Sequence, residues 1–530
     1  MIDRGTPPPG YRIVPPVFNL TVEVLDRPIE RGHGDAVAIR TEQETVTYEQ
    51  LRARVEACAH GLLKLGLRPG TTYLIRLQNS IEFCIAFLAG VRVGAIPVLT
   101  NTLLGSRELE HIVAAVDPRF AITQTEVAEP VRALQRDAAT FERVVVVGDA
   151  GRGEVAFERL AISEGSLPLA DTRADAAAFM VCTSGTTGPL KAVIHAHRWV
   201  IAVGDLSRLR VGADPTDIIL ATGEMSFLGA LGHGFLFPLR AGASGVMLPG
   251  RLDPDRVLKA VERFGVTAMY AVPSLFRKIL AERGIEHRYD LSSLRHVDAG
   301  GEALGHSSYQ EWRQRFACEL YEYFALSEFQ MIVANRPGPP VKPGSVGLPF
   351  PGVGVAVLDE RMEPVGPGEI GHFSIACDDP GLCLGYRKQT ERWRNAIRQG
   401  WFQSGDLFTV DEDGYYWFAG RSDDVFKSRG YQISPVEIEA VLNEHAAVAE
   451  SLVVGDPEPE IGHQIRAVVV LRPGHQPSAA LADEIRATVR SQVAPYKVPK
   501  MIEFADQLPK NPVGKVVRQR VRTAPVPSSP

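Results

Sequence analysis

Small hydroxyl-bearing residues and glycines alternate in the segment TSGTTGPLK at residues 183–191, which follows an apolar, strand-like run at 176–181. Glycine lets the backbone approach an anion closely, and the amide groups of such a turn point inward to bind it. Lys191 adds a positive charge, and the spacing is not that of a Walker loop. The segment predicts a phosphate-binding loop, with a Gly- and Thr-rich surface turn as the alternative. Its binding members are Thr183, Ser184, Gly185, Thr186, Thr187 and Gly188.

Four downstream segments test this prediction: FALSE at 324–328, FQSGDL at 402–407, GRSDDVFKSRGYQISPVEIE at 420–439 and LPKNPVGKVVR at 508–518. Together with the loop, and in this order, they resemble the signature motifs of the adenylate-forming superfamily. That superfamily comprises acyl-CoA synthetases, adenylation domains of peptide synthetases and luciferases. The resemblance covers about residues 19–522, and stretches such as IPVLTNTLL and LGHGFLFPLRAGA are most similar to benzoate- and aminobenzoate-CoA ligases.

The resemblance implies an ATP-dependent acid–thiol ligase that uses ATP, Mg²⁺ and coenzyme A. A small aromatic or alicyclic carboxylic acid would be joined to AMP with release of pyrophosphate, and the acyl group would then pass to the thiol of coenzyme A. Because a carboxylate and a triphosphate repel each other, the site must neutralise and align them, and this supplies most of the catalysis.

Residue roles follow from the matching motif positions. Lys191 and the loop would bind the β- and γ-phosphates, Ser327 would donate to the α-phosphate, and Glu328 would hold Mg²⁺. Lys515 would bridge the attacking carboxylate and the α-phosphate. The resemblance also implies that Asp406 and Arg421 fix the ribose and that Gly301 and Glu302 pack against the adenine.

The second half-reaction implies a moving domain. Asp423 matches the family's hinge position, about which the C-terminal domain would swing after adenylation. The swing would withdraw Lys515 and form a tunnel for the pantetheine arm of coenzyme A. The tunnel-lining residues are expected to be Lys427, Ser428, Arg429, Gly430 and Tyr431.

The acyl pocket departs from the benzoate-type pattern in two places. Tyr323-Phe324-Ala325 stands where those ligases have smaller residues that include a glycine. The larger side chains of this protein should therefore fill space in the pocket. Gly229-Ala230 stands where they often have an aromatic residue followed by glycine, so that change should open space. The expected pocket residues are Phe227, Gly232, His233, Tyr323, Phe324 and Ala325, with core packing as the alternative for each.

Other functions compete with an aryl acid–CoA ligase. They are a medium-chain fatty acid–CoA ligase, a stand-alone adenylation enzyme that loads a carrier protein, a luciferase-like oxidative enzyme, and a catalytically silent nucleotide-binding protein. The segment at 427–431 favours coenzyme A over a carrier protein, and the intact Lys191, Glu328, Asp406 and Lys515 argue against a silent protein.

Alternating helical and strand patterns must position these residues. Helices are predicted at 48–65 and 81–93, and strands at 72–77, 95–99 and 143–147, which favours doubly wound α/β subdomains in an N-terminal domain of residues 1–420. Short strands between Gly- and Pro-rich turns predict a β-rich subdomain at about 344–420. Residues 421–530 predict a small, mobile α+β domain with helices at 435–443 and 480–493 and strands at 449–454 and 465–471.

Composition narrows the partners. The 530 residues carry a net charge of -6, so no basic excess exists to bind a nucleic-acid backbone. The sequence has no uncharged apolar run long enough to cross a membrane, so membrane insertion is not expected. The scattered cysteines are expected to be buried free thiols of a cytoplasmic protein. The resemblance implies a small carboxylic acid, ATP and coenzyme A as the partners. A homodimer and reversible acetylation of Lys515 are further predictions.

Overall fold

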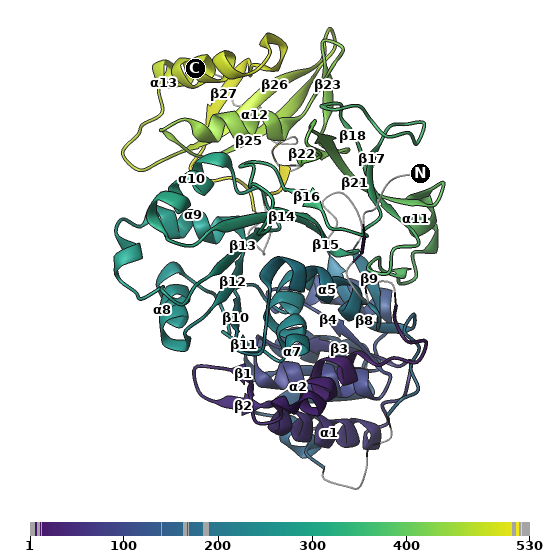
Figure 1. Cartoon of the computed structure of the whole chain (residues 1–530). Coiled ribbons are helices and arrows are strands. Elements are labelled where there is room, and N and C mark those ends of the chain that lie inside the picture. The colour runs from purple at the N-terminus through teal and green to yellow at the C-terminus, as the bar shows by residue number, and fades with distance from the viewer. Residues whose placement is uncertain are drawn as a thin grey trace.

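A computed structural model gives the fold, and it describes residues 6–7, 11, 13–138, 140–162, 167, 169–183, 190–510, 516–518 and 521. Two large sheets, a smaller antiparallel sheet and a C-terminal α+β unit follow one another along the chain (Figure 1). The fold is the expected one, with a large N-terminal domain and a smaller C-terminal domain. No helix in the described ranges is long and apolar enough to cross a membrane.

The first sheet has eight strands in the order β19-β9-β8-β4-β3-β5-β6-β7. It is parallel from β8 to β7, whereas β9 and β19 are antiparallel edge strands. The bounds are β3 Thr72–Arg76, β4 Ile96–Leu99, β5 Phe120–Gln124, β6 Arg143–Val147, β7 Val155–Ala156, β8 Ala177–Thr183, β9 Lys191–Ala196 and β19 Gly385–Tyr386.

Helices cover both faces of this sheet because successive strand residues point to opposite sides. Tyr73 and Ile75 face the core that holds α1 Tyr48–Lys64 and α2 Ile81–Arg92. Leu74 faces α3 Ser106–Val116 and α4 Glu129–Ala138. The predicted helices and strands of this region are therefore confirmed, with small differences at their ends.

The second sheet has nine strands in the order β16-β15-β14-β13-β12-β10-β11-β1-β2. The strands from β14 to β1 are parallel, and β2, β15 and β16 are antiparallel. The bounds are β1 Val37–Arg40, β2 Thr45–Thr47, β10 Ile218–Ala221, β11 Ser244–Val246, β12 Ala268–Ala271, β13 His296–Gly300, β14 Leu320–Leu326, β15 Gln330–Ala334 and β16 Leu348–Pro349.

One face of the second sheet packs on three amphipathic helices, α8 Pro254–Phe264, α9 Pro273–Ala281 and α10 His306–Arg315. The helices of the other face lie between the two large sheets (Figure 1). They are α5 Trp199–Val211, the short α6 Leu228–Leu231, the π-helix η5 Gly232–Leu236 and α7 Phe237–Ala241. This middle layer and the inner face of the second sheet form one continuous core.

The β-rich region is an antiparallel sheet of β17 Val355–Leu358, β18 Gly371–Ala376, β20 Ile397–Arg398, β21 Trp401–Val410 and β22 Tyr416–Arg421. The short strand β19 comes from the same stretch of sequence but pairs with β9 of the first sheet. The predicted β-rich segment therefore also extends one of the large sheets. The expectation of buried cysteines is wrong for Cys377, which is exposed just after β18.

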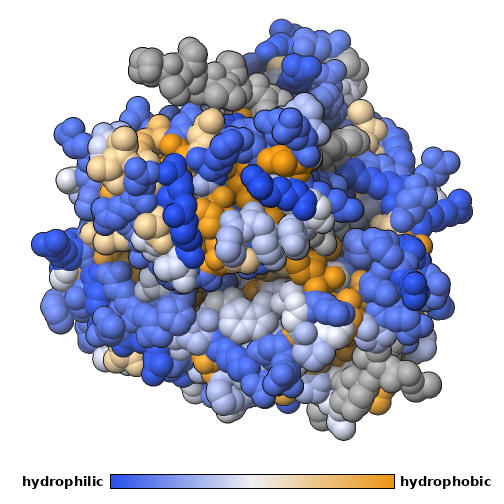
Figure 2. Space-filling model, turned by 90° about the horizontal axis from the view of Figure 1, so that it is seen from above, coloured by the Kyte–Doolittle hydropathy of each residue, from blue (hydrophilic) through white to orange (hydrophobic). Residues whose placement is uncertain are grey.

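The C-terminal unit has a sheet of β25 Val448–Glu458, β26 Gly462–Leu471 and β27 Met501–Phe504, with α12 Pro435–Glu444 and α13 Ala479–Gln492 packed on it. Ser434 caps α12 by accepting from the Glu437 amide, and its hydroxyl also donates to the Ala419 carbonyl at 2.6 Å. Figure 2 looks onto the molecule from above, where hydrophilic residues cover most of the surface and apolar ones gather toward the middle.

Candidate active site

Three side chains from distant parts of the chain meet where β9, β14 and β19 lie close together. Lys191 opens β9, Glu328 follows β14, and Tyr386 ends β19. Lys191 Nζ lies 3.2 Å from Glu328 Oε1 and 3.3 Å from the Tyr386 hydroxyl, which donates to the same carboxylate oxygen at 2.6 Å. Glu328 and Tyr386 are buried and Lys191 is partly buried, so the carboxylate is largely shielded from water.

The phosphate loop begins and ends at this cluster. Thr183 closes β8 and pairs directly with Lys191 across the two antiparallel strands, so the loop joins neighbouring strand ends. Five of the predicted binding residues, Ser184, Gly185, Thr186, Thr187 and Gly188, lie outside the described residues, and so does Lys515.

Ser327 is positioned by a buried histidine. His195 Nε2 lies 2.9 Å from the Ser327 carbonyl, and its ring stacks on Phe179 with centroids 4.9 Å apart. Burial lowers the pKa of His195 to about 3, so the ring is neutral and its Nε2–H donates to the carbonyl. The sequence interpretation had given no role to His195 or to Tyr386, and neither stands in a motif that would have singled it out.

Asp406 and Arg421 face each other on neighbouring strands, β21 and β22, where their backbones are in register. Arg421 Nη1 lies 2.9 Å from Asp406 Oδ1. Burial raises the pKa of Asp406, an effect that the Arg421 guanidinium opposes. The Glu328 carboxylate is near enough to interact electrostatically with both residues. Asp406 Oδ2 and Arg421 Nε are buried and have no partner among the described residues.

Gly301 and Glu302 follow the carboxyl end of β13, beside the strand that leads to Ser327. Gly301 is exposed and has a φ of +97°, a conformation that favours glycine. The Glu302 carboxylate pairs with Arg277 at 2.9 Å. The turn therefore presents backbone, rather than a free acidic side chain, at the edge of the sheet.

The expected coenzyme A segment is a hairpin of β23 Phe426–Ser428 and β24 Tyr431–Ile433. Arg429 and Gly430 form its two-residue turn, both with positive φ, as in a type I′ turn. Tyr431 is 53% exposed and stacks on Tyr496 with ring centroids 4.1 Å apart. Lys427 is exposed and Ser428 is buried, and the exposed Asp423 precedes the hairpin. Figure 1 places β23 in the upper part of the molecule, above β9, which carries Lys191.

A wall of aromatic rings occupies the expected acyl region. The ring of His233, on η5, lies 5.0 Å from that of Tyr270 and 5.5 Å from that of Tyr323. Tyr323 fills space as expected, because a Cβ on Gly300 would come within 2.5 Å of its ring. The expected opening at Gly229 is absent, since a Cβ there would lie 2.7 Å from the Tyr270 hydroxyl.

One predicted pocket residue faces elsewhere. Phe324 packs against Phe373 and Phe408 of the β-rich sheet, with ring centroids 5.1 and 4.7 Å away. Tyr323 and Phe324 are successive residues of β14 and point to opposite faces, so both cannot join the wall of His233. Phe324 therefore lies on the face of β14 opposite Tyr323, and its place in the acyl pocket stays a prediction.

The other predicted pocket residues border the aromatic wall or remain partly buried. Gly232 lies against Gln330, since a Cβ there would be 2.6 Å from the Gln330 side-chain amide. Phe227 and Ala325 are partly buried. Gln330 was not predicted; it is buried, and neither its Oε1 nor its Nε2 has a partner among the described residues.

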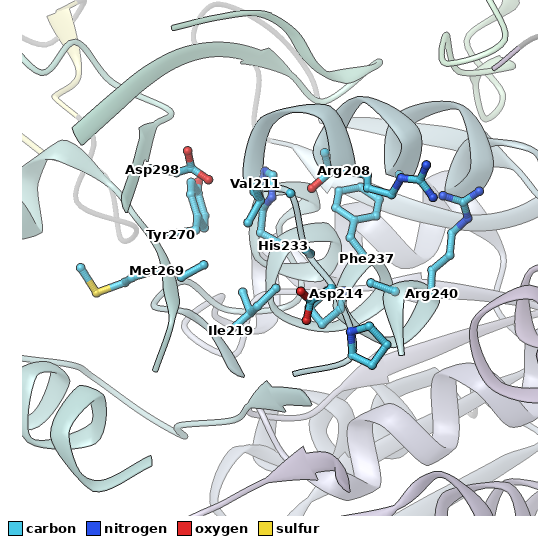
Figure 3. A pocket seen from close by; sticks show the side chains of 18 of the residues that line it. Arg208, Val211, Asp214, Ile219, His233, Phe237, Arg240, Met269, Tyr270 and Asp298 are labelled. Carbon is cyan, nitrogen blue, oxygen red and sulfur yellow. The ribbon is translucent and has the colours of Figure 1, made fainter. Parts of the chain in front are cut away.

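Beneath the aromatic wall lies a cavity of about 450 Å³, between α5 and α7 on one side and β10 and β12 on the other. Its lining includes His233, Phe237, Met269, Tyr270 and Asp298. In the view of Figure 3, Tyr270 and Asp298 lie on one side of the cavity and Arg208 and Arg240 on the other. The cavity is of the size that small-molecule sites require.

Comparisons with known proteins agree with this geometry. The family model described as AMP-binding enzyme matches residues 26–387, and that of the AMP-binding enzyme C-terminal domain matches residues 437–515. The benzoate–CoA ligase of Thauera aromatica is 31% identical over 98% of this chain and 99% of its own. The 3-hydroxybenzoate–CoA ligase of Aromatoleum sp. is 30% identical over 95% and 96% of the two chains.

Two solved structures share the fold over nearly the whole chain. The anthranilate CoA ligase AuaEII, in complex with anthranoyl-AMP, has a TM-score of 0.90 and 30% identity and covers 96% of this chain and 98% of its own. A benzoate CoA ligase from Burkholderia xenovorans has a TM-score of 0.86 and 27% identity over 96% and 100%. The resemblance to adenylate-forming, benzoate-type ligases is thus confirmed, and the chain belongs to the AMP-binding enzyme family.

Proposed function

We propose that the protein is an ATP-dependent aromatic acid–CoA ligase. The observation that carries the proposal is the meeting of Lys191, Glu328 and Tyr386 at the end of the phosphate loop, within electrostatic reach of Asp406 and Arg421. A nucleoside triphosphate needs a cation for its phosphates, a carboxylate for its metal ion, and hydrogen-bonding groups for its ribose, all in one place. Lys191, Glu328 and the pair of Asp406 and Arg421 would supply these three.

In the first half-reaction, a carboxylate oxygen of the acid attacks the α-phosphorus of ATP. The bond to the β-phosphate oxygen breaks, and pyrophosphate leaves with the electron pair. Lys191 and the loop would neutralise the departing phosphates, and Ser327, held by His195, would donate to the α-phosphate. We assign Lys515 to the attacking carboxylate and the α-phosphate, and Asp406 and Arg421 to the ribose.

Mg²⁺ fits the residues present. Glu328 offers a buried carboxylate, one oxygen of which is oriented by Lys191 and Tyr386. The described residues contain no cluster of three or more metal-ligating side chains, which suits an ion held by one carboxylate and the phosphates. When bound, the ion would neutralise phosphate charge.

In the second half-reaction, the sulfur of coenzyme A attacks the acyl carbonyl, the bond to AMP breaks, and AMP leaves. We propose a division into two domains, residues 1–420 and 421–530, with Asp423 as the hinge between them. Rotation about this hinge would withdraw Lys515 from the active site and bring in the hairpin at 427–431. The exposure of this hairpin supports the proposal, because Lys427, Arg429 and Tyr431 are accessible in the conformation seen. The thiol proton is released to solvent water as AMP leaves.

The acid is proposed to be aromatic because the wall of His233, Tyr270 and Tyr323 is made of flat rings, and because the relatives named above act on benzoates. A medium-chain fatty acid remains the alternative substrate. A cytoplasmic location, a homodimer and acetylation of Lys515 remain predictions.

The test is acid-dependent release of pyrophosphate. Purified protein, ATP and Mg²⁺ should release pyrophosphate with an aromatic acid, and adding coenzyme A should convert the acyl-adenylate to a thioester identified by mass spectrometry. A phosphopantetheinylated carrier protein in place of coenzyme A should not be acylated. Absence of pyrophosphate release with every aromatic, alicyclic and medium-chain acid would refute the proposed function.

A further inference from the structure

The cavity between α5, α7, β10 and β12 opens at the edge of the second sheet that is remote from the proposed catalytic groups. Its exposed lining includes Asp214, in the turn that leads into β10, and its walls include Ile219 and Ala268 at the starts of β10 and β12. Gly301 and Ser327 instead follow the carboxyl ends of β13 and β14, which run parallel to β10 and β12. Since ligands of parallel sheets bind at the carboxyl ends of the strands, this cavity is separate from the proposed nucleotide site.

The interior of the cavity is mostly apolar. Val211, Ile219 and Ala268 form a small buried cluster that is separate from the continuous core. Phe237 and Tyr270, which belong to that core, line the same cavity. The packing of these two apolar groups is therefore interrupted by a space of about 450 Å³, which is enough for a ring or a short chain.

Two exposed arginines lie at the mouth of the cavity. They are Arg31, in the π-helix η2 Ile29–His33, and Arg208, in the last turn of α5. Neither side chain makes a hydrogen bond or an ion pair with a described residue. A guanidinium group is always charged, and its planar arrangement of donors matches a carboxylate or a phosphate. The mouth therefore offers two available cations to an anionic group.

The other charged groups near the mouth are already engaged. Arg240 pairs with Glu23 at 3.0 Å and with Asp205 at 2.7 Å. Asp214 Oδ1 accepts from the amide and the hydroxyl of Thr216, and these hydrogen bonds lower the pKa of the Asp214 carboxyl, so it stays an anion. These carboxylates would repel a doubly charged phosphate monoester more than a singly charged group. The mouth therefore favours a monoanion, of which a carboxylate is the simplest.

An anion in the interior fixes the orientation of the ligand. Asp298 lines the cavity and accepts from Arg210 at 2.6 Å, while its second oxygen lies 2.7 Å from His296 Nε2. The Arg210 and His296 side chains lower the pKa of Asp298 against the effect of burial. Figure 3 shows Asp298 across the cavity from Arg208. A ligand's carboxylate is thus attracted at the mouth and repelled inside, so its apolar part enters first.

We propose that this cavity is a second binding site, for a small acid with one carboxylate and an apolar body. The carboxylate binds Arg31 and Arg208, and the body packs against Ile219, Phe237 and Ala268. An acid held there lies at the wrong edge of the sheet to be adenylated, so it is a bound ligand and not the substrate. The site does not depend on the proposed function.

The experiment measures binding of octanoate by isothermal titration calorimetry. The proposed catalytic site is first filled with 5′-O-(N-benzoylsulfamoyl)adenosine, an analogue of an acyl-adenylate. 1-Octanol provides the same chain without the charge, and octanedioate adds a second carboxylate at the far end. We expect one octanoate per chain, bound at least about fivefold more tightly than 1-octanol. Octanedioate should bind more weakly than octanoate, because its second carboxylate would lie near Asp298.

Variants localise the binding. Replacing Arg31 and Arg208 together by glutamine should weaken octanoate by about fivefold or more and leave 1-octanol unchanged, because two charged contacts at exposed positions are lost. Arg283→Gln is the matched control, since Arg283 is also exposed and does not line the cavity. Ser207→Leu adds bulk to the buried wall on α5 and should weaken both probes.

Three results would overturn the proposal. They are displacement of octanoate by the adenylate analogue, equal affinities for octanoate and 1-octanol, and an unchanged octanoate affinity in the folded double variant. Failure of the proposed function is recognised separately, by the absence of pyrophosphate release with any acid. Octanoate binding that depends on both arginines would support the second site in either case.

Discussion

The hydroxyl of Tyr386 donates a 2.6 Å hydrogen bond to Glu328 Oε1 and lies 3.3 Å from Lys191 Nζ. Tyr386 thus orients a carboxylate and a lysine that belong to different motifs. Burial and the neighbouring Glu328 anion raise the pKa of Tyr386, so the phenol remains protonated and able to donate.

Replacing Tyr386 by phenylalanine should slow adenylation. A hydrogen bond to a charged group contributes about 1.5–3 kcal/mol, so kcat/KM for pyrophosphate release should fall roughly tenfold to a hundredfold. Tyr289→Phe is the matched control, because its hydroxyl also donates to a carboxylate, that of Asp255 at 2.8 Å, on the exposed surface. Equal activities of the two variants would show that Tyr386 does not orient the site.

Lys515→Ala should separate the two half-reactions. If Lys515 bridges the acid and the α-phosphate, its loss should lower adenylation by at least about a hundredfold, as removal of a charged transition-state contact does. Thioester formation from supplied acyl-adenylate and coenzyme A should continue. Comparable losses in both assays would contradict the role given to Lys515, and Lys510→Ala, which loses a surface pair with Glu450, is the control.

Asp423→Pro tests the hinge. Proline restricts the backbone that must rotate, so adenylation should be nearly unchanged while thioester formation slows. Single-turnover measurements of each step provide the readout. Thioester formation at the rate of the unaltered protein would remove the hinge assignment.

The helices and strands that position the site were predictable where their apolar residues recur at helical spacing or form a short β-branched run. The helix at 48–65 was expected from apolar residues at helical spacing, and α1 indeed spans Tyr48–Lys64, with a capping box between Thr47 and Gln50 at its start. The buried strand at 143–147 was expected from its β-branched run, and β6 has these bounds.

Contacts between distant residues were not predictable in this way. Tyr386 reaches Glu328 because β19 pairs with β9 in a register that places it beside Val193, and no local pattern indicates that pairing. Phe324 packs on Phe373 and Phe408, on the face of β14 opposite Tyr323, because successive strand residues alternate, and the motif position alone did not indicate that contact. The space at Gly229 is occupied by Tyr270, which is 41 positions away in the sequence, so no local pattern indicates the contact.

Gly229→Ala tests that last contact. The new Cβ would lie 2.7 Å from the Tyr270 hydroxyl oxygen and 3.2 Å from the ring carbon that bears it. Overpacking of this kind should lower the free energy of unfolding by about 1–3 kcal/mol, measured by urea titration. Tyr270→Phe in the same chain should restore part of the loss by removing the closer atom. A Gly229→Ala protein as stable as the original would mean that Tyr270 moves aside without cost.

Three buried histidines should make the protein sensitive to mild acid. Burial lowers the pKa of His195 and His233 to about 3 and that of His197 to about 4, below the ordinary value of 6.5. The unfolded chain takes up these protons below pH 6.5 and the folded chain does not, so stability is complete above that pH and falls toward pH 4. Each histidine contributes at most about 1.4 kcal/mol per pH unit to that slope.

His197→Gln isolates one of these contributions outside the proposed site. His197 Nδ1 accepts from the Leu20 amide at 3.1 Å, and a glutamine oxygen can accept in its place without titrating. Urea unfolding at pH 7.5, 6.0 and 5.0 should show the free energy of unfolding falling less steeply for this variant, by up to about 1.4 kcal/mol per pH unit. His287→Gln, at an exposed position, should retain the original slope. If His197→Gln also retained it, His197 would have to be protonated in the folded protein, and its burial could not be the source of the acid sensitivity.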